Sequence, residues 1–245
     1  MGEKIHPYQL LQIKLAELIR NTPAGERLLS EPRLAKELGV SRATLREAMR
    51  TFEAQGLIRR KQGIGTFVVG HTQVIETGLE VLESIETLAD KIGLKVSMGD
   101  LHIRQIQANA EYAEALQVEL DTPLVHVSRV IHAEKRPVAY LIDILTENIL
   151  TAADIDEGFS GSVIDLLQKR GSPKLMKSYA VIQAVAADSS IARALEIQRG
   201  DVLLKFIAWL YDQDGNVVVY SFSYFLPGYF KFHVNRRVGE LEYSL

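Results

Sequence analysis

The chain contains no cysteine, no uncharged apolar run long enough to cross a membrane, and no glycine-rich phosphate loop placed after a strand. The absence of cysteine excludes disulfides, thiolate metal sites and cysteine nucleophiles. A membrane-spanning helix needs about 20 apolar residues, and residues 1–9 lack the apolar centre of a signal peptide. We therefore expect a cytoplasmic protein. The six histidines show no metal-binding spacing, and 63-GIG-65 is too short for a dinucleotide fingerprint, so we expect neither metal nor cofactor.

The formal net charge of −3 is small, but its distribution along the 245 residues is uneven. Residues 1–70 carry an excess of basic groups, whereas the remaining residues carry a larger excess of acidic groups. The length favours two domains. A basic domain joined to an acidic one indicates a head that binds a polyanion, although two solvated surfaces can differ in charge by chance.

Hydrophobic spacing predicts three helices in the basic part of the chain. The first covers residues 6–21 and the second follows a capping residue at Ser30. The third begins at Ser41 and ends before Gly56. Its expected buried stripe consists of Leu45, Ala48, Met49 and Phe52.

Three arginines, Arg42, Arg46 and Arg50, recur at four-residue intervals on the third helix. They fall about a right angle away from the apolar stripe, so the helix displays them together. Strand-like residues 57–60 and 66–69 then flank a turn with two glycines, which permit positive φ. Helix, turn, helix and hairpin predict a winged helix whose recognition helix enters the major groove of DNA. A solvated basic helix beside a surface hairpin, the alternative, would not need this order.

The stretch 25-GERLLSEPRLAKELGVSRATLREAMRTFEAQGLIRRKQGIGTFV-68 resembles the winged-helix head of the GntR family of bacterial transcription regulators. Within 30-SEPR-33 the arginine position of the family's Ser-Glu-Arg triplet holds Pro32, and Leu29 replaces a family proline. Either Arg33 makes that contact from another angle or the contact is lost. The resemblance and the wing imply DNA contacts by Arg33, Ser41, Arg42, Thr44, Arg46, Arg60, Lys61, Gln62 and Gly63.

A second domain of the α+β class is predicted beyond a linker over residues 71–90. Strand-like runs cover 124–132, 138–145, 202–212 and 217–225, and helical stretches lie near 109–117, 162–170 and 188–196. Their order resembles the UTRA effector-binding domain of the HutC branch of the family, whose fold is like that of chorismate lyase. We expect a DNA-binding domain over 1–70 and an effector-binding and dimerisation domain over 91–245.

Related UTRA domains bind phosphorylated sugars through charged and polar groups that are largely replaced here. Arg129 is retained, but a carboxylate at Glu86 would repel a phosphate at the start of a helix. We expect a small apolar carboxylic acid instead, paired with Arg129 and oriented by Ser162 or Tyr224. Alternatively, the apolar replacements are ordinary core residues and the pocket lies elsewhere. The expected effector residues are Ser84, Arg129, Ile131, Leu141, Ser162, Ile164, Val219 and Tyr224.

These patterns predict a DNA-binding transcription regulator, expected to be a homodimeric repressor on a palindromic operator and controlled by a small-molecule effector. Two other functions compete with this one. A chorismate-lyase-like enzyme would share the second domain's fold, but the sequence offers no catalytic pair for it. A constitutive DNA-binding protein would use the second domain for dimerisation only, and an effector-dependent change in operator affinity would separate it from a regulator.

Overall fold

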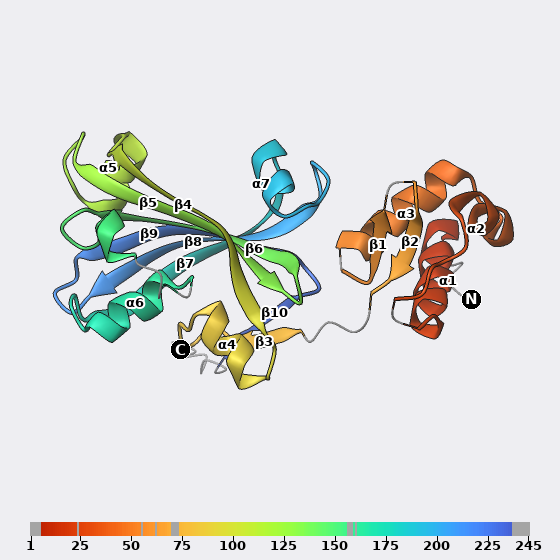
Figure 1. Cartoon of the computed structure of the whole chain (residues 1–245), viewed down its shortest axis with the longest axis horizontal. Helices are drawn as coiled ribbons and strands as arrows, with labels where there is room; N and C mark the ends of the chain where they lie inside the picture. Colours follow the sequence, from red (N-terminus) through yellow and green to blue (C-terminus); the bar gives the residue numbers. More distant parts are fainter. Residues whose placement is uncertain are drawn as a thin grey trace, which may run out of the picture.

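The computed structural model describes residues 6–23, 25–54, 56–61, 63–69, 74–155, 159 and 161–236. Figure 1 shows a small helical head with a two-stranded hairpin and a larger unit built on an extended sheet. The α+β class is confirmed.

The head contains three helices and a hairpin, in the predicted order. Ser41 caps the third helix, because its Oγ accepts a hydrogen bond from the backbone N–H of Thr44 at 3.0 Å. Ser30 precedes the second helix, but within the described head its side chain makes no capping hydrogen bond. The elements are α1 (Pro7–Asn21), α2 (Glu31–Leu38), α3 (Arg42–Ala54), β1 (Ile58–Lys61) and β2 (Gly65–Val68).

The apolar stripe of α3 is buried as predicted. Leu45, Ala48 and Met49 are fully enclosed, and they pack against Leu15 of α1 and Leu34 of α2. Each large side chain removed from water contributes about 1.5–3 kcal/mol. This packing fixes the rotation of α3 about its axis, so the face that carries the arginines points out of the head.

A six-stranded antiparallel sheet forms the second unit, in the order β4-β5-β6-β9-β8-β7. The four strands with predicted residue ranges are present, and β4 and β7, for which no residue range was predicted, form the two edges. The strands are β4 (Val96–Gln107), β5 (Pro123–Ala133), β6 (Arg136–Thr146), β7 (Leu175–Ala186), β8 (Val202–Asp212) and β9 (Val217–Phe225).

Part of the expected linker over 71–90 belongs to the second unit. β3 (Ile75–Gly78) pairs in parallel with β10 (Phe230–His233), and Ile85 at the start of α4 (Ile85–Lys91) packs in the same core. The partner of β3 lies at the far end of the chain, so no local pattern marked it as a strand. We therefore place the start of the second unit at Ile75.

Helices cover both faces of the sheet. α6 (Val163–Arg170) packs on the face that carries Val127, and α5 (Ala110–Leu116) packs on the opposite face at Tyr220. The remaining helical elements are η1 (Ala152–Asp154) and α7 (Ser189–Ala194). Among the helices of the described residues, none combines the length and the apolar character needed to span a membrane.

Candidate nucleic-acid interface and effector site

A basic groove lies between the start of α2, the start of α3 and the wing, which is the hairpin of β1 and β2. Its volume is about 350 Å³, and Glu31 is the acidic side chain in its lining. The basic side chains that line it are Arg27, Arg42, Arg46, Arg60 and Lys61. Such an excess of cations around one groove suits the phosphates of a duplex, because each neutralised phosphate releases condensed counterions.

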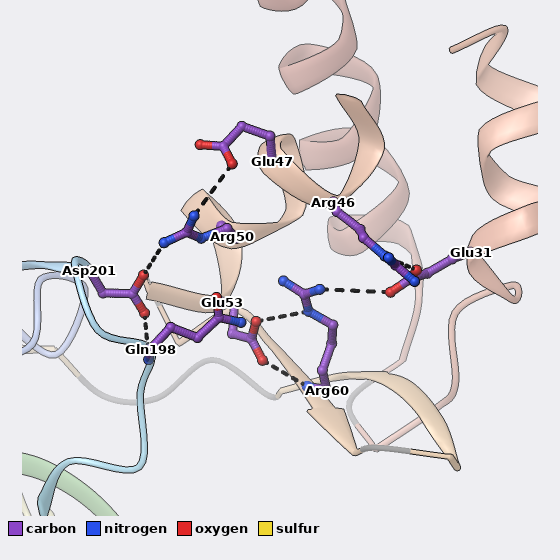
Figure 2. A network of polar contacts seen from close by, with 8 residues as sticks. All are labelled: Glu31, Arg46, Glu47, Arg50, Glu53, Arg60, Gln198 and Asp201. Atoms are coloured by element: carbon purple, nitrogen blue, oxygen red, sulfur yellow. Dashed lines mark hydrogen bonds and ion pairs between the residues drawn. The ribbon is translucent and has the colours of Figure 1, made fainter. Parts of the chain in front are cut away.

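The arginine row of α3 divides into two parts. Arg42 and Arg46 line the basic groove, where Arg46 Nε donates to Glu31 Oε2 at 2.6 Å and its side chain stays 53% exposed. Arg50 points toward the second unit instead, and its Nη2 lies 3.1 Å from Asp201 Oδ1 (Figure 2). The expectation that all three arginines are displayed together therefore holds only for the first two.

Arg60 connects the wing to α3. Its Nε donates to Glu53 Oε2 at 2.9 Å, its backbone N–H donates to Glu53 Oε1 at 3.1 Å, and its Nη1 lies 3.7 Å from Glu31 Oε1 (Figure 2). These bonds hold the guanidinium half-buried beside the groove. The geometry indicates that Arg60 positions the wing relative to the recognition helix rather than being displayed freely.

Most other predicted DNA-contacting residues are exposed, namely Arg33, Ser41, Thr44, Lys61 and Gly63, whereas Gln62 lies outside the described residues. Gly63 and Gly65 have φ of +73° and +141°, as the predicted wing turn requires. A Cβ at Gly65 would overlap the guanidinium of Arg27. The prediction missed Arg27, because its place beside the wing depends on a bridge between Arg27 and Phe67, two residues far apart in the sequence.

Within the part of the chain that the structure describes, three contacts join the head to the second unit. The Arg50–Asp201 pair is the shortest; Arg59 Nη2 lies 3.7 Å from Glu196 Oε2, and Gly56 lies against the ring of Tyr229. The hydrogen bond to Asp201 raises the pKa of Arg50 above its usual value. A cavity of about 530 Å³ opens at this junction. No sequence pattern predicted these contacts, because they depend on how the two domains are arranged.

In the second unit, the expected effector arginine already has partners. Arg129 is 4% exposed; its Nη1 donates to Asp143 Oδ2, and its Nε donates to the backbone carbonyl of Gly161. A buried guanidinium needs such partners, because an unpaired buried charge is strongly destabilising. The prediction of an arginine free to receive a carboxylate is therefore corrected. A lone Asp143 inside an otherwise apolar strand was the sequence signal for its partner.

Two helix N-termini meet beside this arginine. Ser84 caps α4 by accepting from Thr87 N at 3.0 Å, and its Oγ donates to Asp165 Oδ2 at 2.6 Å. Ser162 caps α6 by accepting from Asp165 N at 3.0 Å. Both serines were predicted at this site, and each is buried and engaged. The positive ends of two helix dipoles therefore point to one region.

Glu86 lies at the same place, and one of its two carboxylate oxygens lacks a partner among the described residues. Its Oε1 is buried without a hydrogen bond among the described residues, and a Cβ at Gly161 would overlap this atom. Burial raises the pKa of Glu86 above its ordinary value, with nearby Arg129 opposing the shift. An orphaned buried acceptor costs free energy until a donor reaches it. This oxygen can therefore accept a hydrogen bond that none of the described residues supplies.

The remaining predicted effector residues lie either in a hydrophobic core or on the face of the sheet opposite Arg129. Ile131 and Leu141 belong to one buried core, whereas Val219 and Ile164 belong to the core beneath α6. Tyr224 pairs in register with Tyr140, while Leu141 pairs with Arg129, so alternation places Tyr224 on the other face of the sheet. Tyr224 therefore cannot orient a ligand at Arg129, and that prediction is wrong.

Comparison with known proteins agrees with this architecture. Residues 7–68 match the family described as bacterial regulatory proteins, gntR family, and residues 91–231 match the UTRA domain. The histidine utilization repressor of Pseudomonas putida is 28% identical over 210 residues, which cover 83% of this chain and 82% of that protein. The probable fructoselysine utilization operon transcriptional repressor of Escherichia coli K12 is 26% identical over 197 residues, covering 80% of this chain and 79% of the relative.

The solved structure of PhnF from Mycobacterium smegmatis shares the fold. It superposes with a TM-score of 0.64 at 19% identity and covers 94% of this chain and 100% of the other. Together, the two matched segments include the winged-helix head and most of the second unit. The chain therefore belongs to the GntR family of bacterial regulatory proteins, and a UTRA domain follows its helix-turn-helix head.

Proposed function

We propose that this protein is a transcriptional repressor that binds a palindromic operator and is controlled by a small molecule bound in its UTRA domain. The observation that carries the proposal is the basic groove between α2, α3 and the wing, with Arg42 and Arg46 side by side on the recognition helix. Relatives named as repressors of histidine and fructoselysine utilisation support the direction of regulation. The family and these relatives are transcription regulators, and no observation favours an enzymatic second domain.

Control of DNA binding passes, in this proposal, through the contacts between the head and the second unit. Arg50 belongs to the recognition helix, and it cannot bind Asp201 and a DNA phosphate with the same nitrogen. Docking of the head on the UTRA domain therefore competes with docking on DNA. A ligand that changes how often the two units touch shifts this competition, and by linkage DNA shifts the ligand affinity equally.

The effector we propose is a small carboxylic acid that also carries a nitrogen hydrogen-bond donor. The carboxylate is favoured by the N-termini of α4 and α6. The donor is favoured by the orphaned Oε1 of Glu86. A plain apolar acid, the earlier expectation, would leave Glu86 without a partner. Histidine and fructoselysine, which appear in the names of relatives, both combine a carboxylate with nitrogen donors.

Selection of the operator from genomic fragments tests the main proposal. The purified chain is mixed with a fragment library, the retained fragments are sequenced, and binding is titrated at low and high salt. We expect one enriched palindrome and an affinity that falls steeply with salt, because the groove contacts phosphates. Retention that shows no sequence preference, or that does not depend on salt, would refute a sequence-specific regulator.

A further inference from the structure

The segment before α2 is attached to the wing. Backbone hydrogen bonds of 2.8 to 2.9 Å join residues 25–28 to Thr66 and Val68 of β2. Leu28 is buried in the core of the head, whereas Arg27 is exposed. Because neighbouring side chains of an extended segment point to opposite faces, burial of Leu28 turns the side chain of Arg27 outward. The backbone of the wing therefore fixes the position of Arg27.

The guanidinium of Arg27 lies at the turn of the wing. It occupies the space that a Cβ at Gly65 would fill, and it lines the basic groove together with Arg42. Within the described residues, neither Arg27 nor Arg42 forms an ion pair, whereas Arg46 and Arg60 are each paired with a glutamate. Arg27 and Arg42 can therefore bind an anion without first breaking an ion pair.

Arg33, for which the sequence predicts a DNA contact, lies outside this groove. Glu31 and Pro32 at the start of α2 line the groove, but the next residue along the helix does not. Each helical residue is rotated by about 100° from the one before it, so Arg33 presents its exposed side chain on another side of α2. The groove thus gains a cation from Arg27 and not from Arg33.

We propose that Arg27 binds a phosphate of the DNA backbone on the wing side of the basic groove, in place of the contact predicted for Arg33. A guanidinium offers two parallel N–H donors, which match two oxygens of one phosphate. Arg27 belongs to the wing and not to the recognition helix, so its role is to position the duplex and not to read its bases. The inference rests on the proposed function, because it requires a duplex in the groove.

The test uses the full chain and two matched variants, Arg27→Gln and Arg33→Gln. Each removes one positive charge from an exposed side chain and keeps a long polar stem. Fluorescence anisotropy measures their affinity for the selected operator and for a scrambled duplex at several salt concentrations. Arg27→Gln should weaken binding to both duplexes by about tenfold. It should also make the plot of log affinity against log salt shallower by about 0.9 for each bound head.

Arg33→Gln should change affinity by no more than about twofold, because a charge outside the groove is screened by salt. Operators with single methylphosphonate linkages then locate the phosphate, since each such linkage removes one negative charge from the backbone. At the contacted position the neutral linkage should weaken binding by the wild type and by Arg33→Gln. It should have no further effect on Arg27→Gln.

Equal losses of affinity for the two variants would overturn the inference, and so would a loss for Arg27→Gln that is confined to the operator. If Arg27→Gln does not fold, Arg27→Lys decides. It keeps the charge without the paired donors, so it should bind both duplexes more weakly, and wild-type affinity would count against the contact. A wild type that binds no duplex removes the proposed function as well, whereas a wild type that binds the operator while the two glutamine variants behave alike removes only the role of Arg27.

Discussion

Arg50 of the recognition helix and Asp201 of the UTRA domain form an ion pair, with Arg50 Nη2 3.1 Å from Asp201 Oδ1. Asp201 is the more enclosed partner, with 11% of its side chain exposed against 35% for Arg50. Its other oxygen accepts from the backbone N–H of Gln198 at 3.0 Å, which fixes the carboxylate in place (Figure 2). The UTRA domain thus holds the Asp201 carboxylate in place beside the Arg50 guanidinium, in the position that a DNA phosphate would otherwise take.

Replacing that anion should strengthen DNA binding. Partly exposed ion pairs contribute up to about 1 kcal/mol, so Asp201→Asn should raise operator affinity by about three- to fivefold at low salt. Asp100→Asn removes the same charge from an exposed site on the same domain and serves as the control. Fluorescence anisotropy with labelled operator measures both. Equal gains in operator affinity for the two variants would mean that only long-range charge affects DNA binding. No gain in affinity for either variant would contradict competition between Asp201 and DNA for Arg50.

Arg46 offers a direct test of the basic groove. Arg46→Ala should weaken specific binding by about 1–3 kcal/mol if the guanidinium contacts a base edge, because a bidentate contact is then lost. Arg20→Ala, which removes the same charge from an exposed residue of α1, is the matched control. Titration against the selected operator and a scrambled duplex separates the roles. A loss of equal size on both duplexes would assign Arg46 to the phosphates and not to the bases.

Local patterns predicted the head better than they predicted the effector site. The stripe of Leu45, Ala48 and Met49 repeats with the helical period, so it predicted both α3 and the face of α3 that is buried. The pair of Arg129 and Asp143 depends on cross-strand register, and the edge strands β4 and β7 lack the clear alternation of half-buried strands. Long-range pairing and domain arrangement decide these features, and neither leaves a periodic trace in the sequence.

Glu86 should make stability depend on pH. Burial raises its pKa in the folded state above the ordinary value of 4.5, so the folded protein binds this proton more tightly than the unfolded chain does. The stabilising effect of protonation is complete below the unfolded pKa and is lost as the pH rises through the folded pKa. Glu86→Gln should therefore raise the melting temperature at pH 7 and change it less at pH 4.

Thermal unfolding between pH 4 and pH 8 measures this dependence. Glu114→Gln changes an exposed carboxylate of α5, so its difference in melting temperature from the wild type should stay constant across this pH range. If the increase in melting temperature caused by Glu86→Gln does not grow with pH, Glu86 is solvated or already paired in the folded state.

The effector site gives the last prediction. Sugar phosphates should bind poorly, because the apolar side chain of Ile131 beside Gly161 leaves sugar hydroxyls unpaired, at about 1–3 kcal/mol for each buried unsatisfied group. A carboxylic acid with a nitrogen donor should bind, since its donor satisfies the buried Oε1 of Glu86. Calorimetry with imidazolepropionate, cyclopentylpropionate and glucose 6-phosphate compares these chemistries, because the first two differ mainly in the ring nitrogens.

We expect imidazolepropionate to bind at least about tenfold more tightly than cyclopentylpropionate, which corresponds to one charge-assisted hydrogen bond of about 1.5 kcal/mol. Glu86→Gln should remove most of that preference while leaving the weaker acid unaffected, because only the donor contact depends on the carboxylate. Glu114→Gln should preserve the preference. Two results would contradict this site: tight binding of glucose 6-phosphate, or a preference for the nitrogen-bearing acid that survives Glu86→Gln. Either result would place the effector contacts elsewhere in the protein, and the junction cavity beside Tyr229 would then be the site to examine.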